Sequence, residues 1–190
     1  MKYIATLTLM FLLAIPAVYA QENPVKMTYS GSELTTAFLL QGPDTVIAGE
    51  EKLAGNGSLG QFTYRALRGD DVTTLTITDA CPNGNIPVTE GEGIFRFSDG
   101  SLMTVQITGG SICIDANQIG HLTETYQVTG GTGRFKSASG DLSLAGTLNV
   151  VLSDASGNPL LLTNIGKFDG TVLGVAQQKD HDSDANGDNQ

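Results

Sequence analysis

Glu124 and Tyr126 are the two residues whose positions best suit acid–base chemistry. They stand two residues apart in an alternating segment, on the same parity as Leu122 and Val128. In an extended strand, residues of one parity share one face. A carboxylate on an apolar face has a raised pKa and can act as a general acid or base, with the tyrosine hydroxyl as hydrogen-bonding partner. The alternative is a glutamate at a strand end or on a mixed outer face.

Cys81 and Cys113 are the only cysteines of the chain, and they form the second candidate pair. An isolated pair in an oxidising compartment predicts a structural disulfide. The alternative is two free thiols acting as a redox pair, but the C-x-x-C spacing typical of such sites is absent. We therefore expect the two cysteines to be bonded.

Motifs for metals and for nucleophilic catalysis are incomplete. Residues 182–188 match the opening D-x-D-x-N-G of an EF-hand calcium loop, but no closing carboxylate follows in the sequence. We expect a solvating acidic tail there, with weak calcium contact as the alternative. His121 is the histidine best placed for a Ser-His-Asp triad, and its parity neighbours Thr123 and Thr125 favour a solvated strand face instead. The sequence predicts neither a metal site nor a cofactor.

Two glycine motifs imitate nucleotide-binding loops. Residues 55–60 spell G-x-G-x-x-G, but the alternating segment QFTYRAL follows instead of a helix, which favours a hairpin turn. Residues 128–133 resemble the start of a short-chain dehydrogenase, yet Lys136 stands where that pattern requires its next glycine. We expect both segments to be turns between strands.

Strands must position all these residues, because the apolar periodicity along the chain is two. The clearest case places one apolar parity on a predicted buried face, made of Leu142, Leu144, Leu148, Val150 and Leu152. Segments 62–64, 75–77, 95–97 and 103–107 alternate in the same way, and Asp99-Gly100 is the strongest hairpin signal. Eight or more such strands without an amphipathic helix predict an all-β fold, either an antiparallel barrel or a sandwich. We favour a single antiparallel barrel, because closure removes exposed edges.

The chain divides into three predicted regions. Residues 1–20 have the charged start, apolar run and Val18-Tyr19-Ala20 cleavage site of a signal peptide. Residues 27–175 form the predicted barrel, and residues 177–190 form an acidic tail that lacks the apolar surface needed to fold. No later segment reaches the roughly 18 apolar residues of a membrane helix. We expect a secreted protein, extracellular or periplasmic, without a membrane span.

Composition narrows the possible partners. The 190 residues include 10 Lys and Arg against 20 Asp and Glu, which gives a formal net charge of −10 and no basic cluster. Nucleic-acid binding needs clustered cations that displace counterions, so the charge argues against it. The sequence does not indicate an oligomeric state.

Residues 126–142 carry a resemblance to a known family. The segment YQVTGGTGRFKSASGDL is similar to the signature of the allene oxide cyclase and dirigent barrel superfamily, through Gly130, Gly131, Gly133, Phe135, Ala138 and Gly140. Looser similarity extends from about Gly57 to Val175. The resemblance implies an eight-stranded antiparallel barrel with an apolar lumen. It also implies that the glycines form a structural turn and that Phe135 plugs one barrel end.

Two classes of function follow from these observations. The first is a secreted, noncatalytic barrel that binds a small apolar molecule in its lumen or has a structural or interaction role. The second, implied by the plant enzymes of the superfamily, is a cofactor-free cyclase or isomerase acting on a lipophilic substrate. Few aromatic residues, the absence of tryptophan and a single candidate lumen acid, Glu124, favour the first.

Overall fold

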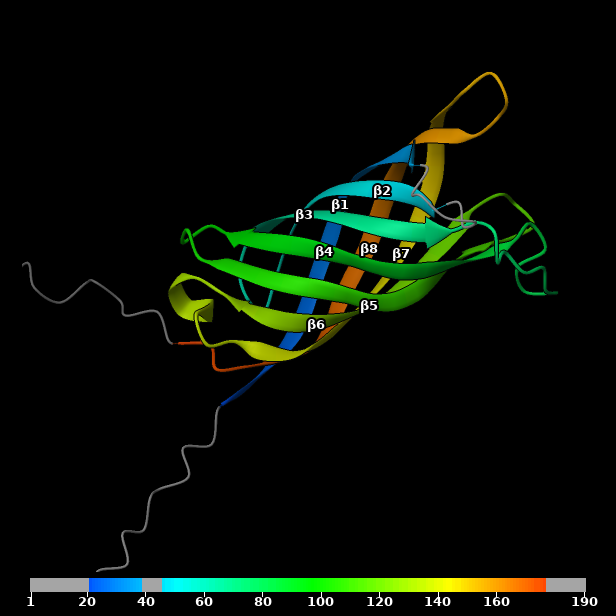
Figure 1. The fold of residues 1–190 in the computed structure, drawn as a ribbon. Helices are drawn as coiled ribbons and strands as arrows, with labels where there is room; N and C mark the ends of the chain where they lie inside the picture. Colours follow the sequence, from blue (N-terminus) through cyan, green and yellow to red (C-terminus); the bar gives the residue numbers. More distant parts are fainter. Residues whose placement is uncertain (1–20, 39–45, 177–190) are drawn as a thin grey trace, which may run out of the picture.

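A computed structural model describes residues 21–38 and 46–176. These residues form one closed barrel in which every strand is antiparallel to its neighbours and β8 pairs with β1 (Figure 1). The strands are β1 (Glu22–Phe38), β2 (Val46–Gly57), β3 (Phe62–Asp71), β4 (Asn85–Phe97), β5 (Leu102–Ile114), β6 (Gly120–Gly131), β7 (Ser139–Ser153) and β8 (Pro159–Leu173). The prediction of an all-β, eight-stranded antiparallel barrel is confirmed.

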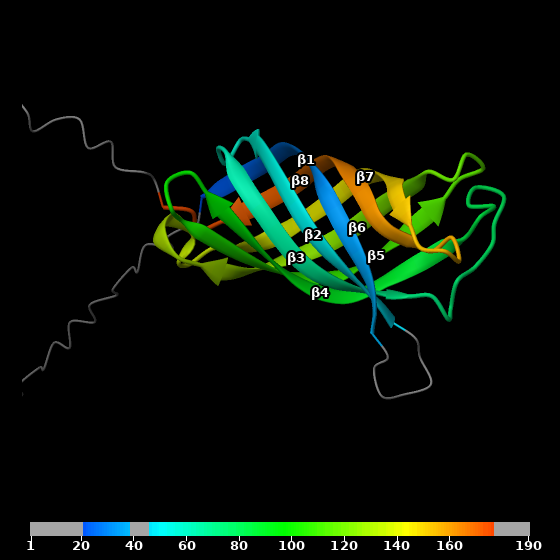
Figure 2. The ribbon, with the colours of Figure 1, turned by 90° about the horizontal axis from the view of Figure 1, so that it is seen from above.

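The period-two pattern of the sequence builds this wall directly. Along β6, Leu122, Glu124, Tyr126 and Val128 are buried, and the residues between them are exposed. The same alternation runs along β3. Both views of the ribbon show the strands tilted across a single wall (Figures 1 and 2). An eight-stranded barrel is just wide enough for side chains to fill its interior.

Aromatic side chains fill the barrel end near the predicted glycine turn. Phe97 stacks on Phe135 with ring centroids 4.7 Å apart, and Phe95 meets Phe168 at 5.0 Å. Phe135 belongs to the short 3-10 helix η1 (Gly133–Phe135) and is fully buried. This end of the lumen is therefore a packed apolar core.

Glycine geometry is specific at two positions before and within η1. Gly133 has a φ of +58°, and a Cβ there would collide with the Ser101 hydroxyl. A Cβ on Gly131 would collide with the backbone carbonyl oxygen of Leu102 on β5. The first position needs the left-handed region and the second a close backbone approach. Both features support the structural interpretation of the turn.

The disulfide prediction is confirmed, because Cys81 and Cys113 are bonded. The bond ties the segment between β3 and β4 to the end of β5. Residues 75–77 lie in that segment, and the prediction of a strand there is wrong. Only an isolated bridge joins Thr76 to Asn85, and Ile77 is 72% exposed. Thr76 meets only the first residue of β4, and beyond this bridge the segment pairs with no strand among the described residues.

Two predicted boundaries also differ from the structure. β1 begins at Glu22, ahead of the predicted barrel start at residue 27. Val150 and Leu152 are exposed, so the prediction that they continue the buried face of Leu142, Leu144 and Leu148 is wrong. The pairing of β6 with β7 ends at Leu148, and beyond it the barrel no longer encloses the strand.

Candidate functional site

A buried arginine surrounded by four carboxylates occupies the lumen beyond the aromatic core. Arg68 projects inward from β3 and is 1% exposed. Its guanidinium donates hydrogen bonds to Glu33 Oε1 at 2.7 Å, Glu51 Oε1 at 2.9 Å, Asp70 Oδ1 at 2.9 Å and Glu124 Oε1 at 3.4 Å. We call these five residues the Arg68 cluster. All of them are buried.

Strand register explains why the five side chains meet. Glu33 on β1 lies directly opposite Glu51 on β2, and opposed residues in an antiparallel pair share one face. Asp70 follows Arg68 by two positions and so points into the same lumen. Glu124 approaches from β6 across the barrel. Four strands therefore contribute to one centre.

Glu124 and Tyr126, the candidate acid–base pair, lie at this centre. The Tyr126 hydroxyl donates a hydrogen bond to Glu124 Oε2, while Glu124 Oε1 accepts the bond from Arg68. Both residues are 1% exposed. The structure thus brings the two residues together in the lumen and adds a cation that the sequence analysis did not place there.

Asn164 and Tyr29 extend the network from β8 and β1. The Asn164 amide donates to Glu51 Oε1 at 3.0 Å, and the Tyr29 hydroxyl donates to Asn164 Oδ1 at 2.9 Å. The second carboxylate oxygens of Glu33 and Glu51 are buried without a hydrogen-bond partner. Because buried charged oxygens are costly when unpaired, these two positions favour protonated carboxyl groups.

Inward-facing glycines make room for the large polar side chains. A Cβ on Gly49 would lie 2.9 Å from Glu33 Oε1, whereas one on Gly91 would collide with the backbone of Leu67 and Arg68 on the neighbouring strand. Gly93 similarly faces the Tyr64 phenol. Small residues opposite large ones are how a small barrel accommodates bulky groups inside.

The charges of the Arg68 cluster do not balance. One guanidinium faces four carboxylates, which would leave a net charge of −3 if all were ionised. Burial raises the pKa of Glu33 to about 7, although the nearby Arg68 opposes this shift. Burial also raises the pKa of Glu51 and of Glu124 above their ordinary values. The cluster therefore retains protons at a pH where exposed carboxyl groups have lost theirs.

The lumen differs from the predicted apolar cavity. Glu124 is not the single lumen acid, since Glu33, Glu51 and Asp70 share its surroundings. Parity could have placed further charged residues in the lumen. Glu33 continues the buried parity of Met27 and Tyr29 in β1, and Arg68 continues that of Phe62 and Tyr64 in β3. Arg68 and Tyr126 are 1% exposed and Phe168 is fully buried, so packed side chains surround these positions of the lumen.

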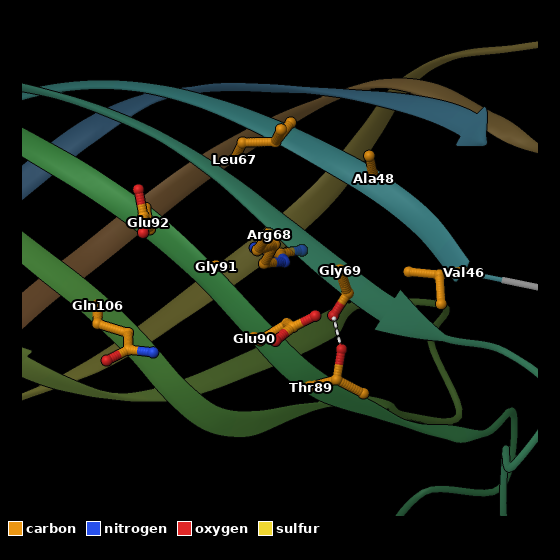
Figure 3. Close-up of a pocket in the computed structure, with 10 residues that line it drawn as sticks. All are labelled: Val46, Ala48, Leu67, Arg68, Gly69, Thr89, Glu90, Gly91, Glu92 and Gln106. Atoms are coloured by element: carbon orange, nitrogen blue, oxygen red, sulfur yellow. Dashed lines mark hydrogen bonds between the residues drawn. The ribbon is translucent and has the colours of Figure 1, made fainter. Parts of the chain in front are cut away.

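A groove lies instead on the outer wall, over β2, β3, β4 and β5 (Figure 3). Its volume is about 600 Å³, and its lining is Val46, Ala48, Leu67, Arg68, Gly69, Thr89, Glu90, Gly91, Glu92 and Gln106. A register shift between Gly69 and Asp70 disturbs the pairing with β4 here, and the Thr89 hydroxyl donates to the Gly69 carbonyl at 3.1 Å. A second hollow shares Leu67, Glu92 and Gln106 with the first.

Several predictions concern residues outside the described part of the chain. The signal peptide of residues 1–20 and the calcium-like motif of residues 182–188 both lie there. Within residues 21–38 and 46–176, no group of three or more His, Cys, Asp or Glu side chains has an arrangement suited to a metal ion. In the same residues, no helix is long and apolar enough to cross a membrane.

Comparison with known proteins found a similarity to a solved structure. No family model matches the sequence. The solved structure of the pterocarpan synthase dirigent protein GePTS1 aligns over 93% of this chain and 100% of that chain, with 13% sequence identity and a TM-score of 0.42. Because the identity and the TM-score are both low, the barrel fold is assigned from the strand pairing of this chain itself.

Proposed function

We propose that this protein is a secreted, noncatalytic β-barrel that binds a small, largely apolar molecule in the groove of its outer wall. The observation that carries the proposal is the combination of a filled lumen and an open groove of about 600 Å³. This volume suits a small molecule, since ligand sites span about 300–1,000 Å³. The proposed ligand site therefore lies on the outside of the wall, and not in the lumen as the sequence predicts.

The lining of the groove favours an apolar ligand with a few polar contacts. Val46, Ala48 and Leu67 supply the apolar surface, and Leu67 is 55% exposed although it is a large hydrophobic side chain. Thr89 and Gln106 supply hydrogen-bonding groups, and the carboxylates of Glu90 and Glu92 also line the groove. An apolar surface with a small number of polar groups is the usual chemistry of a small-molecule site.

Secretion is supported by two independent features. Residues 1–20 have the composition of a signal peptide, and Cys81 and Cys113 form a disulfide. Disulfides persist in oxidising compartments and are rare in the cytosol.

We also propose that the chain is a distant member of the allene oxide cyclase and dirigent superfamily. The eight-stranded barrel and the segment 126–142 support this proposal.

Binding can be tested with N-phenyl-1-naphthylamine, a neutral lipophilic dye whose fluorescence rises in apolar sites. We expect saturable binding to the purified protein, and Leu67→Asp to weaken it at least about tenfold by placing a charge on the apolar lining. Ile165→Asp is the matched control, because Ile165 is similarly exposed but lies on β8. Absence of saturable binding, or equal weakening by both substitutions, would contradict the proposal.

The alternative function is a cofactor-free cyclase or isomerase, and one observation favours it. Glu124 and Tyr126 are hydrogen-bonded inside a cluster that retains protons, as a general acid requires. A substrate would have to displace packed side chains to reach them, because both residues are 1% exposed. Conversion of a lipophilic epoxide or a phenoxy substrate, lost in Glu124→Gln, would establish the enzyme and overturn the noncatalytic proposal.

A further inference from the structure

The groove of the outer wall has two chemically different sides. Val46, Ala48 and Leu67, which come from β2 and β3, form the apolar side. Glu90 and Glu92 lie along β4, on the side of the groove that faces this apolar surface (Figure 3). A ligand that fills the groove therefore contacts hydrocarbon on one side and carboxylates on the other.

Strand register produces this division. Gly69 on β3 lies opposite Glu90 on β4, and the wall is hollow at this row because glycine has no side chain. Two residues earlier on β3, Leu67 lies opposite Glu92. Opposed residues of antiparallel strands have Cβ atoms about 5 Å apart. A molecule seated on Gly69 and against Leu67 therefore lies next to both carboxylates.

Neither of these two carboxylates has a cationic partner in the part of the chain that the structure describes. None of the ion pairs among these residues includes Glu90 or Glu92. The neighbouring Glu50 differs, because Lys52 lies 3.2 Å and Arg65 lies 2.8 Å from its Oε1. The two cations closest to this wall are thus already paired, and the charges of Glu90 and Glu92 are left for a ligand.

Arg68 lines the groove but offers no charge to a ligand there. Its side chain is fully buried, and its guanidinium is held by the four carboxylates of the Arg68 cluster in the lumen. The whole chain has a formal net charge of −10, which favours the approach of a cation over that of an anion. Local and overall charge therefore select the same kind of ligand.

We propose that the groove selects molecules that join an apolar ring or chain to one protonated amine. The apolar part packs against Val46 and Leu67, and the ammonium group donates hydrogen bonds to Glu90 and Glu92. Hydrogen bonds between ionised partners are shorter and stronger than those between neutral groups. This inference rests on the proposed function, in which the groove binds a small and largely apolar molecule, and it adds the charge of that molecule.

Three probes that share one naphthalene ring test the proposal: 1-naphthylmethylamine is a cation at neutral pH, 1-naphthalenemethanol is neutral, and 1-naphthoic acid is an anion. Titration calorimetry with the full chain measures each affinity directly. An exposed ion pair improves affinity by up to about fivefold, so two carboxylates predict that the amine binds about tenfold more tightly than the alcohol. The acid should bind most weakly. Raising the salt concentration should reduce the preference for the amine, because salt screens exposed charges.

Substitutions assign the preference to the groove. Glu90→Gln and Glu92→Gln should each reduce the ratio of amine affinity to alcohol affinity, and the double variant should remove the preference. Asp141→Asn is the matched control, because it removes the same unit of charge from an exposed site on β7 and should retain the ratio. A preference caused by net charge alone would fall equally in Asp141→Asn and in the two glutamate variants. Thermal melts establish that each variant is folded.

The outcomes separate this inference from the proposed function. Equal affinities for the amine and the alcohol in the wild type would overturn the inference, and so would a preference that the double variant retains or that Asp141→Asn reduces equally. In each case the groove would remain a site for apolar molecules. Failure of all three probes and of N-phenyl-1-naphthylamine to bind would instead overturn the proposed function, and this inference with it.

Discussion

Raising the pH from about 5 to about 8 should destabilise this protein, because the Arg68 cluster must release protons while it remains buried. Burial raises the pKa of Glu33 from its ordinary value of 4.5 to about 7, and that of Glu51 and Glu124 in the same direction. Over that range the folded state holds more protons than the unfolded chain. Stability is therefore complete below pH 4.5 and is lost as the pH rises through the folded pKa values.

The size of the effect follows from Glu33. Each pH unit over which the folded state holds one extra proton changes the free energy of unfolding by about 1.4 kcal/mol. Between its ordinary pKa of 4.5 and its folded value of about 7, Glu33 alone lowers the free energy of unfolding by about 3 kcal/mol. Half-buried surface carboxylates with lowered pKa values, such as Asp71 and Asp115, act in the opposite direction, and only below their ordinary value of 3.8 do they lose their contribution.

Urea unfolding at about pH 5 and about pH 8 provides the assay, with the midpoint and slope fitted at each pH. Glu33→Gln keeps an acceptor for Arg68 but removes the titrating group, so it should reduce the pH dependence. Glu92→Gln, on the exposed face of β4, is the control and should behave like the wild type. A wild type that becomes more stable between these pH values, or an unchanged pH dependence in Glu33→Gln, would refute the reasoning.

Three further predictions concern the close-packed glycines and the disulfide. Gly131→Val and Gly133→Val should each destabilise the fold by more than about 1 kcal/mol, because their Cβ atoms would meet Leu102 and Ser101; unchanged melting temperatures would contradict the structural interpretation of the turn. Gly93→Ala should cost about 1–3 kcal/mol, since Tyr64 is packed 4.4 Å from Phe95 and cannot move aside, and denaturant unfolding measures this cost. Reducing the disulfide should lower the free energy of unfolding by about 4 kcal/mol; two alkylatable thiols in the unreduced, denatured protein would show that the bond is absent.

The sequence was sufficient to predict most of the strands, because strand alternation is a local property, whereas the closed barrel was favoured over a sandwich because closure removes exposed edges. Along β6 the alternation alone placed Glu124 and Tyr126 on the buried face, as the structure has them. The disulfide could likewise be predicted from the sequence, because the chain has only two cysteines. Where alternation failed, at residues 75–77 and beyond Leu148, the missing information was whether a neighbouring strand lay alongside.

The Arg68 cluster was not predicted for a different reason. Its members come from β1, β2, β3 and β6, so their meeting depends on strand register, which a single strand does not contain. Charged residues also suggest a solvated face, because they are rarely buried unless they are paired. Arg68 supplies the pairing that makes the burial of Glu33 and Glu51 possible.

The central claim is that the lumen is filled and that the ligand site lies on the outer wall. Methyl NMR spectra recorded during titration with N-phenyl-1-naphthylamine test it directly. We predict that the methyl signals of Val46 and Leu67 shift and saturate, because both residues line the groove, while those of the buried lumen residues Leu122 and Leu144 stay in place. Saturable shifts of Leu122 and Leu144, with Val46 and Leu67 unaffected, would contradict the account and place the ligand inside the barrel.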